Sequence, residues 1–170
     1  LRDLKQGQLI VEKPFLIPSD TLQPEKIYSL IRGEDRPLPF GPNSYGKELP
    51  KGFLKGFIDL VFEYDGKFYV LDYKTNTRVG EGAYSPMSFT KAMVELDFDV
   101  QGHLYSTALH QFLSVYMREY EYDQHYGGYV YVFVRGLDPE NPVNGVYHHK
   151  PDFHVMTSLL EELLPQEVQE

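Results

Sequence analysis

Three side chains in this sequence combine the residue types and the spacing that metal-assisted hydrolysis requires. Asp59 is followed by Asp72 thirteen residues later, and Lys74 comes two residues after that. Magnesium is commonly held in proteins by one or two carboxylates together with several waters. A bound divalent cation can stabilise charge on a phosphoryl group and lower the pKa of an attacking water. A lysine beside it can orient or deprotonate that water, or stabilise the pentavalent phosphorus.

A predicted β-hairpin connects the segments that carry these residues. The runs FLKGFIDLVFEY and KFYVLDYK flank Asp65-Gly66, and an Asp-Gly pair between such runs is a strong hairpin signal. A two-residue turn at this pair sets Tyr64 opposite Lys67. Counting back from the turn, three apolar or aromatic pairs then share one face, because side chains alternate along a strand: Ile58 with Tyr73, Leu60 with Leu71, and Phe62 with Tyr69.

The same register places Asp59 opposite Asp72 on the other face, with Lys74 pointing the same way. Opposed side chains in such a pair lie about 4.5 to 5.5 Å apart at Cβ, so two like charges there destabilise the sheet. A divalent cation between them would offset the repulsion. The alternative is an ordinary charge cluster on an exposed sheet face. The strongly apolar strands weigh against it, because carboxylates inside such strands are unfavourable without a partner.

The segment before the hairpin predicts little regular structure. Residues 1–50 contain seven prolines and are expected to form loops over a core supplied by other segments. Within them, GQLIVEKPFLIP predicts an extended segment that ends at Pro14 or Pro18. PEKIYSLIR, residues 24–32, predicts a short helix with proline in its first turn.

The segment after the hairpin predicts alternating helices and strands. Residues 76–91 are expected to form a loop, and an apolar stripe at intervals of three and four predicts a helix over 92–119. GGYVYVFVRG, residues 127–136, predicts a buried strand, and GVYHH predicts a short edge strand. Residues 152–164 predict an amphipathic helix. We therefore expect an α/β domain with a central mixed sheet flanked by helices.

The amino-acid composition limits which kinds of site and ligand are compatible with this chain. The net charge of −9, from 16 basic and 25 acidic residues, is unusual for a protein that contacts phosphates. The chain has no cysteine, which excludes disulfides, thiolate zinc sites and a cysteine nucleophile. Its apolar runs are far shorter than the ~20 residues that span a bilayer, and its first residues do not resemble a signal peptide. We expect no membrane contact and a cytoplasmic location.

Other polar residues have weaker signals. His103 and His110 lie two helical turns apart, and His148 and His149 point opposite ways in a strand, so neither pair is suited to share one metal. Packing or surface roles are expected for all four. Arg135 could contact a phosphate, with a capping or salt-bridge role equally compatible. The sequence has neither a phosphate loop for ATP nor a G-x-S-x-G nucleophile elbow.

The blocks GFIDLVF, LDYKTN, QGHLYSTALH and GGYVYVFVRG together resemble the C-terminal nuclease domain of RecB-type proteins, in the PD-(D/E)XK nuclease group. The resemblance runs from about Lys51 to about Gly136. It implies a restriction-endonuclease-like fold and a DNA exonuclease or endonuclease of the exodeoxyribonuclease V type. The implied cofactor is Mg²⁺, with Mn²⁺ as a substitute.

The resemblance also implies roles for single residues. Asp59 matches the aspartate of the G-x-x-D block, and Asp72 and Lys74 match the (D/E)-x-K block, which makes these three the expected catalytic residues. Asp59, Asp72 and the backbone carbonyl of Tyr73 would bind the metal. Gln101 and Tyr105 match the Q-x-x-x-Y block and share a helix face. They would contact DNA or support the site, although packing on an amphipathic helix explains them equally well.

One departure concerns the metal ligands. RecB-like nucleases carry an additional histidine ligand well upstream of the first aspartate, whereas the first histidine here is His103. We expect residues 1–170 to form a single, N-terminally truncated nuclease domain that is weakly active or inactive alone. It would consist of a loop-rich lead-in (1–50), a catalytic core (51–136) and a C-terminal turn and helix (137–170). Glu12 is a candidate extra ligand, with an ordinary surface glutamate as the alternative.

In an intact protein, the resemblance implies an ATP-driven helicase elsewhere in the same polypeptide and RecC- and RecD-like partner subunits. ATP would then act only through that helicase. The expected activity is metal-dependent hydrolysis of DNA at double-strand ends in recombinational repair. The alternative functions are a catalytically inactive DNA-binding or subunit-docking module of the same fold, and a stand-alone endonuclease of the same group.

Overall fold

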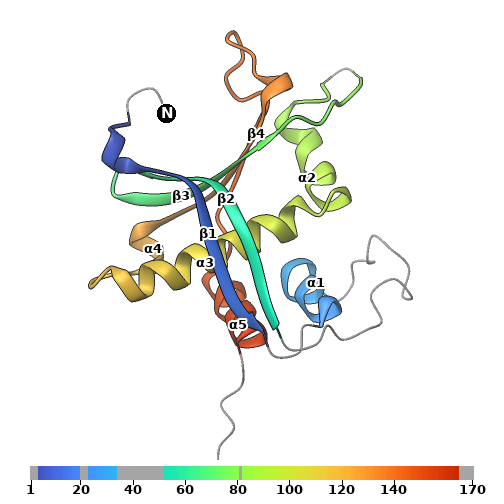
Figure 1. Cartoon of the computed structure of the whole chain (residues 1–170). Coiled ribbons are helices and arrows are strands. Elements are labelled where there is room, and N and C mark those ends of the chain that lie inside the picture. Colours follow the sequence, from blue (N-terminus) through green and yellow to red (C-terminus); the bar gives the residue numbers. More distant parts are fainter. Residues whose placement is uncertain (1–3, 20–22, 34–51, 81, 165–170) are drawn as a thin grey trace, which may run out of the picture.

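The computed structural model describes residues 4–19, 23–33, 52–80 and 82–164. They build a five-stranded mixed sheet in the order β1-β2-β3-β4-β5, in which only β3 and β4 run parallel. Helices flank the sheet, and α3 passes behind β1 and β2 in the view of Figure 1. This is the predicted α/β architecture. The strands are β1 (Leu9–Ser19), β2 (Gly52–Tyr64), β3 (Lys67–Lys74), β4 (Tyr126–Phe133) and β5 (Val146–His149).

The β2–β3 hairpin forms in the predicted register near its turn. Asp65 and Gly66 have φ angles of 51° and 72°, which a two-residue hairpin turn of the primed type requires. Leu60 pairs with Leu71 and Tyr64 with Lys67. Phe62 and Tyr69 also pair, and their rings stack with centroids 5.0 Å apart. The turn chemistry and the apolar pattern therefore agree on one alignment of the two strands.

The extended segment predicted within GQLIVEKPFLIP is confirmed as β1, although it does not end at Pro14 or Pro18. This strand continues past Pro14 and Pro18 to Ser19 and pairs with β2 from Leu9 to Ser19. Prolines are tolerated because β1 is an edge strand, where a missing N–H can face away from the ladder. The predicted helix is confirmed as α1 (Pro24–Arg32). The remaining loop prediction for residues 34–50 lies outside the described residues.

The single helix predicted over residues 92–119 is instead a pair of helices. Helix α2 (Pro86–Glu95) begins within the predicted loop, with proline in its first turn, and α3 (Phe98–Tyr116) follows it. Between them Asp97 adopts a left-handed φ of 55°. Arg32 stabilises this break from α1, because its Nη2 donates to Asp97 Oδ1 at 2.8 Å and to the carbonyl of Val94 at 3.1 Å.

Helix α3 packs tightly against β4. Tyr129, Tyr131 and Phe133 alternate along this strand and are almost fully buried. A Cβ added to Gly102 of α3 would lie 2.7 Å from the Tyr129 ring, so the absence of a side chain allows the close approach. The predicted strand over residues 127–136 is confirmed as β4, followed by a single 3-10 turn, Val134–Gly136.

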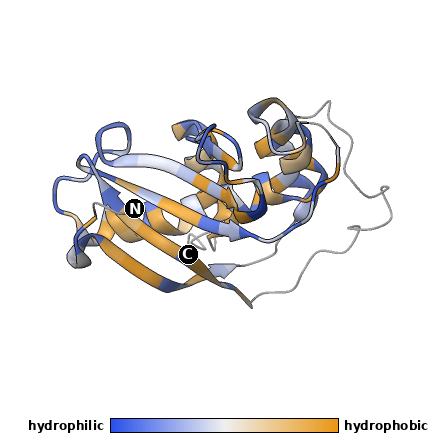
Figure 2. Ribbon diagram, turned by 90° about the horizontal axis from the view of Figure 1, so that it is seen from above, coloured by the Kyte–Doolittle hydropathy of each residue, from blue (hydrophilic) through white to orange (hydrophobic). Residues whose placement is uncertain are grey.

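The C-terminal predictions are also confirmed. Strand β5 forms the second sheet edge, and α5 (Phe153–Leu163) packs with α1 and α3. Figure 2 shows hydrophobic residues along the strands and hydrophilic residues in the connecting loops. No helix in the described part of the chain is long and apolar enough to cross a membrane.

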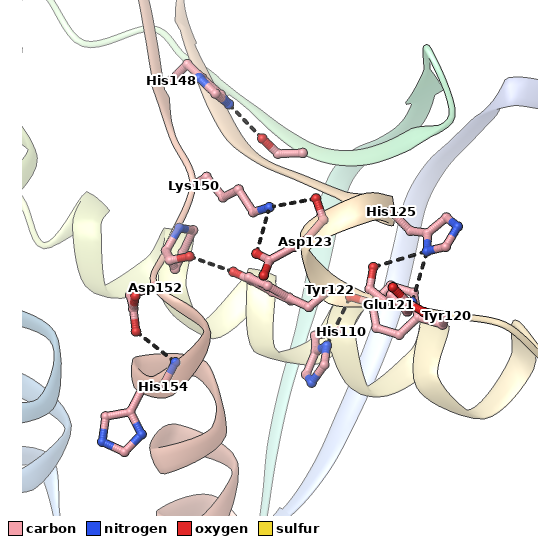
Figure 3. A network of polar contacts seen from close by, with 12 residues as sticks. His110, Tyr120, Glu121, Tyr122, Asp123, His125, His148, Lys150, Asp152 and His154 are labelled. Carbon is pink, nitrogen blue, oxygen red and sulfur yellow. Dashed lines mark hydrogen bonds and ion pairs between the residues drawn. The ribbon is translucent and has the colours of Figure 1, made fainter.

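A polar network joins the end of α3 to α4 (Tyr122–His125), β5 and α5 (Figure 3). His110 Nδ1 lies 3.0 Å from the hydroxyl of Tyr120. The Tyr122 hydroxyl donates to the carbonyl of Pro151 at 2.8 Å. Asp152 caps α5 by accepting from the amide of His154 at 2.8 Å. These contacts hold the start of β4 beside the start of α5.

The histidines of this region have structural contacts, as predicted. His103 Nδ1 lies 2.7 Å from the Asp99 carbonyl, and its ring centroid lies 5.6 Å from that of His149. The neighbouring His148 instead directs Nε2 to the carbonyl of Gly127 at 2.8 Å. Burial lowers the pKa of His103 to about 4, and the nearby His149 adds to this shift.

Acid should therefore destabilise the fold through His103. Its folded-state pKa lies below the value of about 6.5 in an unfolded chain, so protons bind preferentially to the unfolded state. The contribution of this pKa difference to the free energy of unfolding is fully present above pH 6.5 and is lost as the pH falls toward 4. It amounts to about 3 kcal/mol. Urea unfolding at a series of pH values should give a shallower dependence for His103→Gln than for the parent chain. Equal slopes would contradict this account.

Candidate active site

The end of β3 carries the two predicted site residues that share a strand. Asp72 and Lys74 point to the α3 side of the sheet, and Asp72 is only 4% exposed. Lys74 Nζ lies 2.6 Å from Asp72 Oδ2, with 13% and 6% of the two side chains exposed. Because so little water reaches this ion pair, solvent screens it weakly.

Asp59 meets this strand differently from the prediction. The backbone ladder between β2 and β3 ends at Leu60 and Leu71, so Asp59 and Asp72 do not form a backbone pair. Instead, Asp59 Oδ2 accepts a hydrogen bond from the backbone N–H of Tyr73 at 3.0 Å. Separating the strands here reduces the repulsion that direct opposition of two carboxylates would cause. The predicted Ile58–Tyr73 pair is absent for the same reason.

Helix α3 contributes the second layer of the site. Lys74 Nζ donates to Gln101 Oε1 at 2.8 Å, and the hydroxyl of Tyr131 donates to the same oxygen at 3.0 Å. Gln101 Nε2 donates in turn to the Tyr105 hydroxyl at 3.0 Å. The structure therefore brings the predicted pair Gln101 and Tyr105 into one hydrogen-bond network with Lys74.

Aromatic rings surround the lysine. Lys74 Nζ lies 4.3 Å from the centroid of Phe98 and 5.1 Å from that of Tyr131. These two rings stack at 5.6 Å. A cation above an aromatic face is attracted by the ring quadrupole. The rings of Phe98 and Tyr131 therefore help to hold the Lys74 ammonium group in place.

Sequence reasoning did not identify Phe98 and Tyr131 as site residues. The alternation in GGYVYVFVRG indicates only that Tyr131 shares a face with Tyr129 and Phe133. Its place beside the site depends on the parallel pairing of Asp72 with Tyr131, which joins residues distant in sequence. Phe98 depends on the break between α2 and α3.

The two carboxylates act on each other and on the surrounding groups. Burial raises the pKa of Asp72, the ion pair with Lys74 opposes that rise, and the charge of Asp59 adds to it. Burial also raises the pKa of Tyr105, and the charges of Asp72 and Asp59 add to the rise. Asp59, Asp72 and Tyr105 are therefore close enough to share one electrostatic environment.

The residues present fit a hard divalent cation. Apart from its ion pair with Lys74, the buried Asp72 Oδ2 has no contact with hydrogen-bond geometry. Lys74 supplies one positive charge to this oxygen, whereas Asp59 adds a second negative charge nearby, so the site keeps an excess of negative charge that a divalent cation would offset. Within the described ranges, no three His, Cys, Asp or Glu side chains cluster as a metal site. Two carboxylates with waters suit magnesium better than a cation that requires a complete cage of protein ligands.

The weaker candidates lie at the edges of the site. Glu12 occupies the β1 position that faces Asp59 in the register, although the two do not form a backbone pair. It is exposed and has a left-handed φ of 50°. Arg135 Nε donates to the carbonyl of Thr75 at 2.9 Å, which links the ends of β3 and β4. This contact agrees with the capping role of Arg135, which the sequence left open as the alternative to phosphate binding.

Comparisons with known proteins find relatives that match most of this chain. The RecBCD enzyme subunit RecB of Escherichia coli (strain K12) is 39% identical over 156 residues, which are 90% of this chain and 13% of that protein. The same subunit of Buchnera aphidicola (subsp. Schizaphis graminum) is 34% identical over 166 residues, 96% of this chain and 14% of that protein. The chain thus spans about an eighth to a seventh of these relatives' length.

A family model provides the broader assignment. The model of the PD-(D/E)XK nuclease superfamily matches residues 17–169, which include β2, β3, α3 and β4 with the site residues described above, apart from the weaker candidate Glu12. The mixed sheet flanked by helices is consistent with the restriction-endonuclease-like fold of that group. On the match and the architecture together, this chain belongs to the PD-(D/E)XK nuclease superfamily.

Proposed function

We propose that this chain hydrolyses DNA phosphodiester bonds with the help of a divalent cation, magnesium in the first instance. The observation that carries the proposal is the buried Asp72–Lys74 ion pair beside the second carboxylate, Asp59. Membership of a nuclease superfamily supports it. We further propose that residues 1–170 act as one domain with its catalytic core over residues 51–136.

In this proposal Asp59, Asp72 and the backbone carbonyl of Tyr73 hold the cation. When bound, such an ion supplies positive charge that stabilises a phosphoryl group and makes a nearby water more acidic. The buried position of Asp72 keeps its carboxylate oriented before the substrate arrives. The hydrogen bond from the Tyr73 amide orients Asp59 in the same way.

Lys74 is proposed to orient or deprotonate the attacking water, or to stabilise charge on phosphorus. Gln101 is a positioning residue, because its Oε1 accepts from the lysine and from the Tyr131 hydroxyl. Tyr105 supports Gln101 from the next turn of α3. Preorganised donors of this kind stabilise developing charge without reorganising during the reaction.

For the intact protein, we propose a RecB-like helicase-nuclease that processes double-strand DNA ends in recombinational repair in the cytoplasm. The support is the similarity of 90% or more of this chain to proteins named RecBCD enzyme subunit RecB. RecC- and RecD-like subunits would be its partners, and ATP would be used only by a helicase domain outside this chain.

A second candidate is a catalytically inactive module of the same fold that binds DNA or docks a subunit. The net charge of −9 favours it, and so does the absence of a third clustered His, Cys, Asp or Glu among the described residues. The module would bind without cleaving.

Metal dependence separates the two candidates. We expect linear DNA to be degraded in Mg²⁺ or Mn²⁺, to survive in EDTA, and to be degraded again when excess Mg²⁺ is restored. Gel electrophoresis of end-labelled DNA measures all three conditions. DNA that stays intact in both metals, while the chain still retards it in a native gel, would support the module instead.

A further inference from the structure

A groove between β1 and α3 leads away from the candidate active site. It has a volume of about 310 Å³, and buried Ile17, Ile58 and Leu109 form its floor. Its rim includes Lys13, Phe112 and Tyr116. Figure 1 shows β1 and α3 crossing, with α3 behind the strand.

Two contacts show that the groove lies close to the site. Ile58, in its floor, directly precedes Asp59 and pairs with Lys13 on the rim. Phe15, which also lines the groove, contacts the Tyr105 ring edge-on with centroids 5.7 Å apart. One end of the groove therefore lies beside the strand position of Asp59 and the ring of Tyr105.

The groove combines a cation with aromatic rings. Lys13 Nζ lies 3.6 Å from the centroid of Phe112, whose ring lies 4.6 Å from that of Tyr116. Tyr116 is 75% exposed, so its ring can accept a planar partner. Single-stranded nucleic acid is recognised by this combination, because bases stack on aromatic rings while cations contact the phosphates.

Charge distinguishes this groove from three other hollows on the described surface. Its described lining includes a lysine and no carboxylate, in a chain with 25 acidic residues. The other hollows are lined by acidic residues such as Glu161, Asp123 and Glu119. A polyanion is therefore repelled less at this groove than at those hollows.

We propose that this groove binds an unpaired segment of a DNA strand that extends from the scissile phosphate. Tyr116 stacks against a base, and Lys13 contacts a backbone phosphate. From Tyr105 to Tyr116, α3 covers about 16 Å at its ordinary rise, which allows contact with more than one nucleotide. The identity of the ligand rests on the proposed function.

Binding without cleavage tests the groove directly. The anisotropy of a fluorescent oligothymidylate is measured in EDTA, where metal-dependent hydrolysis cannot occur. We expect Tyr116→Ala to weaken binding about tenfold, because one stacked base contributes that much. Lys13→Gln should lower the slope of log K against log salt by about 0.7, the value for one phosphate contact on a single strand. Tyr64→Ala and Lys91→Gln are matched controls on exposed residues outside the groove.

Two substrates sharpen the test. An abasic oligomer of the same length should bind Tyr116→Ala and the parent chain alike, since it has no base to stack. A blunt duplex should depend little on Tyr116, because its bases are already stacked. Equal affinity of Tyr116→Ala and the parent chain for oligothymidylate would overturn the proposal and leave the groove to a protein segment.

The groove and the nuclease activity can fail separately. Oligothymidylate binding that depends on Tyr116, in a chain that never cleaves DNA, would retain the groove and refute the proposed reaction. If the chain cleaves DNA but neither Tyr116→Ala nor Lys13→Gln changes its binding of oligothymidylate, the proposed reaction is retained and the groove proposal is refuted. No detectable binding of the oligomer by the parent chain also overturns the groove.

Discussion

Replacing Asp72 by asparagine should reduce metal-dependent DNA cleavage by about 10³-fold while the chain remains folded. Asparagine keeps the shape of the side chain but removes the charge that attracts a cation. Losing several kcal/mol of transition-state stabilisation corresponds to a rate change of this size. Initial rates on end-labelled linear DNA at saturating Mg²⁺ measure the loss, and circular dichroism checks the fold.

Asp65→Asn is the matched control, because it makes the same chemical change on the same hairpin. Asp65 lies in the exposed turn with φ 51°, a conformation that asparagine also tolerates. This variant should cleave like the parent chain. If Asp72→Asn retained substantial metal-dependent activity, Asp72 would not hold the cation.

The second large effect concerns Lys74→Met, which should lose both activity and stability. Methionine fills much of the same space but leaves the Asp72 carboxylate buried and unpaired beside Asp59. Removing one partner of a buried pair costs about 3 kcal/mol in the free energy of unfolding. Solvent screening lowers this figure only slightly, because the two side chains are only 13% and 6% exposed. Urea unfolding measures the change.

Magnesium gives this prediction a distinctive signature. In Lys74→Met a bound cation would be the main compensation for the carboxylate charge, so added Mg²⁺ should stabilise this variant more than the parent chain. Lys91→Met removes an exposed lysine that pairs with Glu95 on α2, and it should alter neither stability nor its response to Mg²⁺. Equal responses of Lys74→Met and the parent chain would argue against a shared cation at Asp72.

The parts of the fold that could be predicted depend on local chemistry. The Asp65-Gly66 turn and the alternating pattern around it determine the pairing of Leu60 with Leu71. The same register could not predict that the strands separate at Asp59. That separation depends on the repulsion of two carboxylates and on the hydrogen bond from the Tyr73 amide.

The features that the sequence did not predict share one cause, because each depends on contacts between residues that are distant in sequence. The break between α2 and α3 is held by Arg32, which is distant from Asp97 in sequence. The extent of β1 depends on β2, which follows it after a long segment. The surroundings of Lys74 depend on the parallel alignment of β3 with β4. Local patterns thus predicted that Asp59, Asp72 and Lys74 lie close together, whereas tertiary contacts determine what surrounds them.

Gly102 has a consequence beyond core packing. It follows Gln101, so the spacing that it permits between α3 and Tyr129 also sets how far Gln101 lies from Lys74. A methyl group at position 102 would push the helix outward and lengthen that hydrogen bond. Misplacing a reacting group by about 1 Å can reduce a rate about 10²-fold. In the proposed reaction, substitution at this position is therefore limited by the alignment of Lys74 as well as by steric fit.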